Sequence, residues 1–175
     1  MPELDIEIKP VDWVSSVAIG KPGERTFFIQ ARGNGQKVSL LLEKIQLQSL
    51  VQGIDDFLGE IKEKYTDLAE PDVKYNPGSM TVNPPVDPLY RVGEVGLAYA
   101  EDEDMAIILL KEILTTQEGQ DDLRVVRLWV SRTQLAVFAD YAQTVINSGR
   151  MICPQCGEPM DPAGHLCPKK NGHKK

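Results

Sequence analysis

The side chains with the clearest chemistry lie near the C-terminus, where all three cysteines fall within fifteen residues. These are Cys153, Cys156 and Cys167, and His165, one of only two histidines in the chain, lies two positions before the last of them. Three thiolates and one imidazole form a tetrahedral ligand set that is typical of zinc. We therefore predict a metal site made of Cys153, Cys156, His165 and Cys167.

The spacing of these residues supports a metal site and leaves two alternatives open. A Cys-x2-Cys turn aims two sulfurs at one ion, and Pro154 and Gly157 favour that turn. The odd number of cysteines and the lack of an export signal argue against a disulfide. His173 could replace His165 as the fourth ligand, and a thiolate-rich site could take iron instead of zinc.

Four protein ligands close the coordination sphere of zinc, whereas a catalytic site usually keeps one position open for water. A structural zinc ion is therefore expected in a C-terminal tail that spans residues 150–175. The tail contains few apolar residues, chiefly Ile152, Met160 and Leu166. Metal binding would then supply much of the folding free energy of this zinc knuckle.

The tail also resembles the C-terminal signature of an uncharacterised bacterial family of conserved hypothetical proteins. The residues that carry the resemblance form the run Cys153-x-x-Cys156-Gly-x-Pro159-x-Asp161-Pro162-x-Gly164-His165-x-Cys167-Pro168-x-x-Asn171-Gly172. Members are similar in length to this chain. The resemblance implies a zinc-type tail in a cytoplasmic bacterial protein, and it carries over no catalytic residue.

The composition indicates an ordinary globular chain, with 42% hydrophobic and 26% charged side chains in 175 residues. No apolar run approaches the length of a membrane span, and the first residues do not resemble an export signal, so we expect a cytoplasmic location without membrane contact. From Arg150 onward there are five basic and two acidic residues, which gives this tail a net charge of +3. Because the whole chain has a net charge of −7, the remaining residues 1–149 carry −10. Such a body repels nucleic-acid phosphates unless a local basic face overrides the average.

Residues 1–149, the body of the chain, contain a pattern that repeats at an offset of 88 residues. Strand-like alternation over residues 38–42 and 126–130 leads in each case into a basic residue, Lys44 or Arg132, and then into a helical pattern. The apolar positions of the two predicted helices follow one buried face, at Leu47, Leu50, Val51, Ile54, Phe57 and Leu58 and at Leu135, Phe138, Ala139, Ala142, Val145 and Ile146. The repeat predicts an internal duplication.

Each half carries further strand patterns upstream of its helix. In the first half these are residues 4–8, 14–19, 26–31 and 37–42, and the Gly33-Asn34-Gly35 run predicts a hairpin between the last two. In the second half they are residues 92–100, 105–113 and 124–131. We predict an α+β fold built from two antiparallel strand-meander-plus-helix units, residues 1–69 and 89–149. A proline-rich connector over residues 70–88 joins them.

The body offers little catalytic chemistry, because both histidines and all cysteines lie in the tail. Its paired acids, Asp55-Asp56, Asp121-Asp122 and the turn at residues 101–104, are expected on solvated surfaces. We therefore expect a non-catalytic zinc-binding adaptor or regulatory module with an unknown protein partner. The alternative is a single-stranded nucleic-acid-binding protein resembling the Pur and Whirly folds, with stacking drawn from Trp13, Phe27, Phe28, Tyr99 and Trp129. The oligomeric state is left open.

Overall fold

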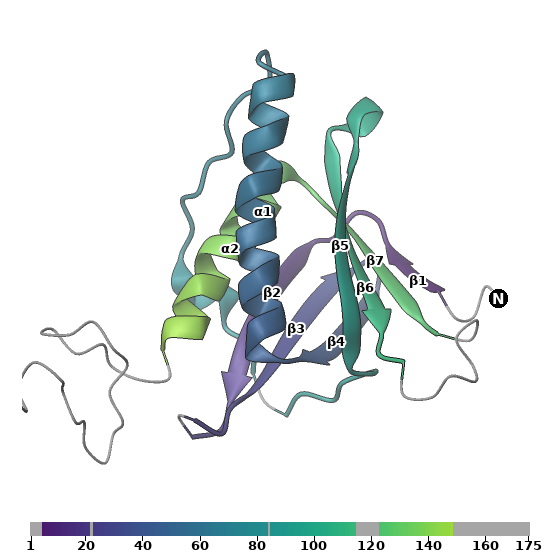
Figure 1. Ribbon diagram of the computed structural model, residues 1–175, viewed down its shortest axis with the longest axis vertical. Coiled ribbons are helices and arrows are strands. Elements are labelled where there is room, and N and C mark those ends of the chain that lie inside the picture. The colour runs from purple at the N-terminus through teal and green to yellow at the C-terminus, as the bar shows by residue number, and fades with distance from the viewer. Residues whose placement is uncertain (1–4, 22, 84, 115–122, 149–175) are drawn as a thin grey trace, which may run out of the picture.

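The computed structural model describes residues 5–21, 23–83, 85–114 and 123–148, which form two β-sheets and two α-helices (Figure 1). The mixed α+β class predicted from the sequence is confirmed. In chain order the elements are β1 (Asp5–Ile8), β2 (Trp13–Ile19), β3 (Thr26–Gly33), β4 (Gln36–Leu42), α1 (Lys44–Lys64), the 3-10 helix η2 (Pro77–Met80), β5 (Val92–Ala100), the 3-10 helix η3 (Glu101–Glu103), β6 (Met105–Glu112), β7 (Val125–Val130) and α2 (Arg132–Asn147).

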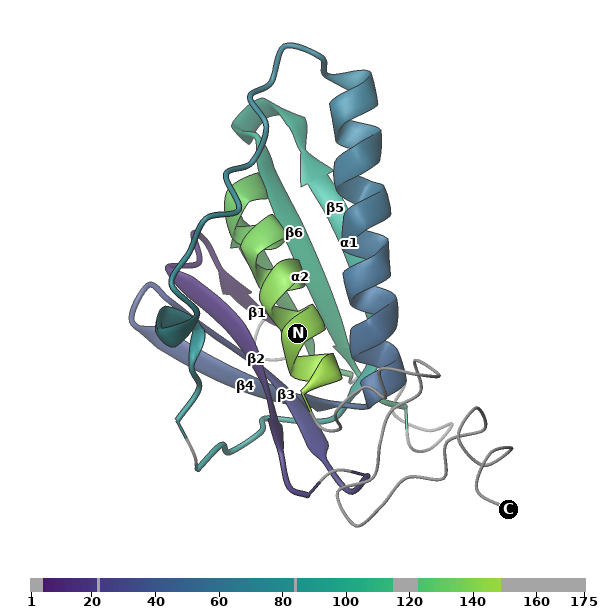
Figure 2. The same ribbon diagram turned by 90° about the vertical axis from the view of Figure 1, so that its left-hand side faces the viewer.

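One sheet has four strands in the order β1-β7-β6-β5, and the other has three in the order β2-β3-β4. Both helices lie on the same side of the four-stranded sheet, with α1 beside β5 and α2 between α1 and the three-stranded sheet (Figures 1 and 2). Among the described residues, one hydrophobic core takes side chains from both sheets and both helices, including Ile29, Leu47, Leu128 and Phe138. The core therefore lies between the two helices on one side and the two sheets on the other.

The strand β1 departs from the predicted antiparallel arrangement. It pairs in parallel with β7, with Ile6 opposite Val126 and Ile8 opposite Leu128. Its alternating pattern correctly indicated which side chains are buried, since Ile8 is fully buried. The alternating pattern does not predict which strand is the partner, because a strand with one apolar face can bury that face in either sheet.

Each helix carries, as its third residue, a glutamine that also contacts the opposite half of the chain. Gln46 Oε1 accepts a hydrogen bond from the Glu43 N–H (2.7 Å), and Gln134 Oε1 accepts one from the Ser131 N–H (2.8 Å). Both bonds satisfy donors at a helix N-terminus. The amide nitrogen of Gln46 donates to the carbonyl of Val92 at the start of β5, as Gln134 donates to Val11 just before β2.

The two sheets are joined by backbone hydrogen bonds at both ends. The Leu41 N–H of β4 donates to the Tyr90 carbonyl just before β5 (3.1 Å). The Val11 N–H just before β2 donates to the Trp129 carbonyl of β7 (2.8 Å). The segment that leads into each meander thus pairs with the last strand of the other meander.

The predicted connector runs over the outer face of the three-stranded sheet. Trp13 Nε1 donates to the Ser79 carbonyl (2.7 Å) and Ser15 Oγ donates to the Met80 carbonyl (2.6 Å). Directly after the connector, the Leu89 N–H donates to the Ser39 carbonyl (2.7 Å). These contacts bury Ser15 and Ser39 on a face that would otherwise meet solvent. The connector therefore has a structural role, as a cover for one sheet.

Within the described ranges, neither helix combines the length and the hydropathy that crossing a lipid bilayer requires.

Candidate functional site

The predicted metal ligands Cys153, Cys156, His165 and Cys167, and the alternative ligand His173, lie outside the described residues. Among the residues that are described, no group of three or more histidine, cysteine, aspartate or glutamate side chains is placed to hold a metal ion. The described residues do contain a large groove, and it forms the candidate site of the body.

The groove has a volume of about 600 Å³ and lies between α1 and α2, with residues 65–73 along it. The helices create it because their apolar faces turn toward the core and leave a furrow where they meet. Its floor is apolar and comes from both helices, with Val51, Ile54 and Leu58 on α1 and Ala136 and Ala139 on α2. The small alanines on α2 keep the furrow open.

The rim of the groove carries charged side chains, one of which, Asp140, contacts an aromatic residue beside the groove. Asp55 of α1 and Asp140 of α2 both line it, and Glu70 forms an ion pair with Lys62. Tyr75 donates its hydroxyl to Asp140 (2.7 Å), and its ring meets that of Tyr141 edge-on at a centroid distance of 6.3 Å. Burial and the hydrogen bond to Asp140 raise the pKa of Tyr75 to about 12, so this hydroxyl stays protonated as a donor at neutral pH.

The two residues of the predicted acid pair Asp55-Asp56 lie on different faces of α1. Both side chains are exposed, but only Asp55 lines the groove, whereas Asp56 accepts a hydrogen bond from Gln52 on the helix surface (3.2 Å). Adjacent helical residues point about 100° apart, so one position of such a pair can face a groove while the other faces solvent. Asp55 is thus the acid of this pair that can meet a ligand.

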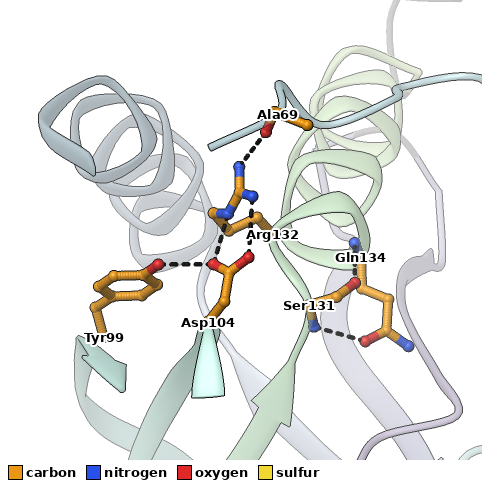
Figure 3. A network of polar contacts seen from close by, with 6 residues as sticks. All are labelled: Ala69, Tyr99, Asp104, Ser131, Arg132 and Gln134. Atoms are coloured by element: carbon orange, nitrogen blue, oxygen red, sulfur yellow. Dashed lines mark hydrogen bonds and ion pairs between the residues drawn. The ribbon is translucent and has the colours of Figure 1, made fainter. Parts of the chain in front are cut away.

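Arg132 closes the groove at the end where α2 begins, and it ties together segments that are distant in sequence (Figure 3). Its guanidinium forms a two-point ion pair with Asp104, from Nε to Oδ1 (2.7 Å) and from an NH2 nitrogen to Oδ2 (3.0 Å). A further nitrogen donates to the Ala69 carbonyl (2.6 Å), and Tyr99 donates its hydroxyl to Asp104 (2.6 Å). A planar guanidinium matches this two-point geometry in a way that a lysine could not.

The hydrogen bonds of this network shift the pKa values of Asp104 and Tyr99. Hydrogen bonds from Arg132, against the opposing effect of burial, hold the pKa of Asp104 below its ordinary value. Burial and the hydrogen bond to Asp104 raise the pKa of Tyr99 to about 12. Asp104 is therefore a carboxylate at neutral pH and Tyr99 a neutral donor, which is the pairing that the geometry requires.

The acidic turn at residues 101–104 is expected on a solvated surface, but Asp104 is instead ion-paired with Arg132. Asp104 adopts a left-handed conformation (φ 49°) at the end of η3, which turns its carboxylate toward Arg132. Aspartate tolerates this backbone region better than most residues. No sequence signal connects two residues 28 positions apart, although Arg132 stood out as the basic residue that starts the second helix.

We expect Arg132→Gln to lower the free energy of unfolding by about 1 kcal/mol at pH 7, because the Asp104 carboxylate is partly exposed and solvent screens the pair. A lowered pKa of Asp104 contributes stability that is fully present above the ordinary aspartate pKa and is lost as the pH falls through the folded-state value. The difference between wild type and variant should therefore shrink toward about pH 2. Urea unfolding at both pH values measures it, and a difference that is independent of pH would contradict the assignment.

The match to a known family covers most of the chain. A family model described as "Protein of unknown function (DUF3090)" matches residues 7–167. No curated protein and no solved structure matches the chain. The resemblance to an uncharacterised family is therefore confirmed, and the matched model describes no enzyme family.

Proposed function

The chain belongs to the DUF3090 family, whose function is unknown, and on that premise we propose that it is a non-catalytic zinc-binding adaptor. The groove between α1 and α2 binds a short peptide segment of a partner protein. The C-terminal tail binds zinc and forms a second docking element. The observation that carries this proposal is the groove itself, with its apolar floor and its acidic rim.

The chemistry of the groove defines the peptide that it would accept. Val51, Leu58 and Ala139 offer apolar contact to one or two hydrophobic side chains. Asp55 and Asp140 on opposite sides offer carboxylates to a lysine or arginine of the same peptide. Helix-lined grooves of this kind commonly bind apolar anchor residues, while rim charges select among sequences.

Zinc binding by the tail is supported by the chemistry of its donor set. Cys153, Cys156, His165 and Cys167 supply three sulfurs and one nitrogen, which suits a closed structural site. The net charge of +3 on the tail contrasts with −10 on the body. A folded knuckle would thus present a basic surface beside an acidic one, and the two could engage different parts of one partner.

An internal duplication is also proposed, and it accounts for the pairing of the two halves. Gln46 and Gln134 are 88 residues apart, occupy the same helical position, and each donates to a backbone carbonyl at or just before the first strand of the opposite meander. Leu41 and Trp129, also 88 residues apart, both make a backbone hydrogen bond to the opposite half, Leu41 as the donor to Tyr90 and Trp129 as the acceptor from Val11. The reciprocity supports an ancestral unit of three strands and one helix that once paired with a copy of itself.

The alternative of single-strand nucleic-acid binding draws less support from the described residues. Trp129 is half-buried on the outer face of its sheet, with Lys9 over its ring at 3.9 Å. Lys9 is paired with Glu103, and Arg127 on the same face is paired with Asp5. These cations are already neutralised by carboxylates of the chain, so the face lacks the positive groove that tracks a phosphate backbone. The adaptor proposal is therefore preferred.

The groove can be tested with a matched pair of charge reversals, Asp55→Lys and Asp56→Lys. Peptides selected from a random library on the zinc-loaded full chain should combine apolar with basic residues. We expect Asp55→Lys to weaken their binding about 10-fold, since an attraction becomes a repulsion at the rim. Asp56→Lys changes the net charge equally but lies outside the groove, so the affinity should stay within about 2-fold.

Fluorescence polarisation with labelled peptides measures both affinities at one fixed salt concentration. An equal loss in the two variants would indicate a general charge effect and would contradict a site in the groove. Unchanged peptide affinity in both variants would also contradict a site in the groove.

A further inference from the structure

The free edge of β5 presents backbone hydrogen-bonding groups that the proposed function does not use. β5 ends the four-stranded sheet, so among the described residues its only strand neighbour is β6. The Glu112 N–H of β6 donates to the backbone carbonyl that precedes β7 (2.8 Å), away from β5. Because the backbone direction alternates along a strand, Leu110 and Ile108 also bond toward β7. Their partners in the register, Val95 and Leu97, therefore direct their N–H and C=O groups outward from the sheet.

The chain itself occupies both ends of this edge but leaves its middle free. At one end, Gln46 Nε2 of α1 donates to the outward carbonyl of Val92 (2.9 Å). At the other end, the Tyr99 ring packs against Phe57 and Tyr65, with centroid distances of 6.4 and 5.5 Å. Between these contacts, the outward backbone groups of β5 have no hydrogen-bond partner within the described part of the chain.

The middle of β5 also lacks the features that usually protect a sheet edge. Such edges are short, charged, interrupted by proline or bulged. β1, at the opposite edge of the sheet, has four residues, two of which are acidic. β5 has nine residues without proline or lysine, its bulge lies at its first residues, and residues 95–100 carry no charge. A long, uncharged and unpaired edge is a template for one more strand.

A cleft of about 310 Å³ lies between this edge and α1, which runs alongside β5 (Figures 1 and 2). Every residue that lines this edge cleft belongs to α1 or β5, so the cleft opens at the free side of the strand. Gly53 of α1 leaves room in it, since an added Cβ would first meet Leu97 Cδ1, at 3.9 Å. Ile45 at the cleft is 63% exposed. The lining residues are Ile45, Gln46, Ser49, Leu50 and Gly53 of α1 and Gly93, Val95, Gly96 and Leu97 of β5.

We propose that an extended segment of a partner protein binds at the free edge of β5 as an added strand. Its backbone bonds to the outward N–H and C=O groups of Val95 and Leu97. Because side chains alternate along a strand, every second side chain of the segment points toward α1 and enters the edge cleft. Main-chain hydrogen bonds then supply affinity, and the alternate side chains supply specificity.

The charges beside the cleft define the segment further. Glu60 lies seven residues after Gly53, so both are on nearly the same side of α1. Glu60 is exposed, and the two lysines that follow it are engaged elsewhere, Lys62 in an ion pair and Lys64 over an aromatic ring. A lysine or arginine of the segment can therefore pair with Glu60. A second copy fits this edge less well, because β5 would bring the acidic Glu94 and no basic side chain.

Peptides selected from a random library on the zinc-loaded Asp55→Lys chain provide the probe. That variant impairs the groove between the helices, so the edge is tested independently of the proposed function. We expect peptides with apolar residues at alternate positions and one basic residue. Hydrogen exchange followed by NMR should show the Val95 and Leu97 amides slowed at least about 10-fold by bound peptide. The amides of Gly96 and Ala98 already bond to β6 and should change less than about 2-fold.

A matched pair of substitutions at Gly53 tests the edge cleft. Gly53→Leu fills the cleft and should weaken peptide binding at least about 10-fold, measured by fluorescence polarisation in the same Asp55→Lys chain. Gly53→Ala is the control, because alanine and leucine have similar helix propensities and a methyl group leaves the cleft open. Its peptide affinity should stay within about 2-fold.

Three results would overturn the proposal. The first is a library that yields no binder, or binders that leave the Val95 and Leu97 amides unprotected. The second is equal affinity for Gly53→Leu and Gly53→Ala. The third is protection of the two amides in the free chain that rises with its concentration, which would assign the edge to a second copy.

Discussion

A Gly33→Ala variant is expected to lose about 3 kcal/mol or more of its free energy of unfolding, because a methyl group has no space at that position. An added Cβ would lie 2.5 Å from the Pro10 carbonyl oxygen and 2.6 Å from Cγ2 of Ile8. Gly33 ends β3 directly against the segment that joins β1 to β2. A clash with backbone there must displace the point at which the two sheets are joined.

The matched control is Gly59→Ala in α1, where an added Cβ meets nothing within 4 Å. Alanine has the higher helix propensity, so this variant should gain about 0.5–1 kcal/mol. Urea unfolding followed by tryptophan fluorescence compares both variants with wild type. Equal stabilities for Gly33→Ala and wild type would mean that the β1–β2 segment does not lie against β3.

Removing one predicted zinc ligand is expected to have the second large effect. Cys153→Ser should abolish zinc binding and unfold the tail, because a three-ligand remnant with so small an apolar core cannot hold the fold. The body should keep its unfolding midpoint, since the described residues of both sheets and both helices already form a closed hydrophobic core. Metal analysis, together with urea unfolding of the full chain, measures both effects.

Histidine variants serve as controls for the ligand set. His165→Asn should lose zinc as Cys153→Ser does, whereas His173→Asn should retain one ion per chain. The opposite result would assign the fourth ligand to His173. Zinc retained at full stoichiometry by Cys153→Ser would contradict a site built on the three cysteines.

The sequence predicted the elements well because their signals are local. Alternation along residues 105–113 and 124–131 indicates strands with one buried face, and the structure has β6 and β7 there with Ile108 and Leu128 fully buried. The turn signal at residues 33–35 is likewise confirmed, since Asn34 (φ 51°) and Gly35 (φ 74°) adopt the left-handed conformations of a tight hairpin. Gly33, the first residue of that signal, is required for a different reason, the close approach of Pro10.

What the sequence could not predict depends on contacts between distant segments. The parallel partner of β1 is a strand more than a hundred residues later, and the Arg132–Asp104 pair joins a helix to a turn that looked solvated. The groove depends on how two helices cross, and neither amphipathic pattern contains that information. The same limitation applies to Asp55 and Asp56, which are equivalent in the sequence but not on the folded surface.

The central claim, that this chain is an adaptor using both groove and tail, is tested most directly by affinity purification from the native cell. Wild type, Asp55→Lys, Asp56→Lys and Cys153→Ser would be compared, and bound proteins and nucleic acid identified. We expect one set of proteins with wild type and Asp56→Lys, and its loss with Asp55→Lys and with Cys153→Ser. A protein set that all four chains retain equally, or nuclease-sensitive nucleic acid in its place, would contradict the account.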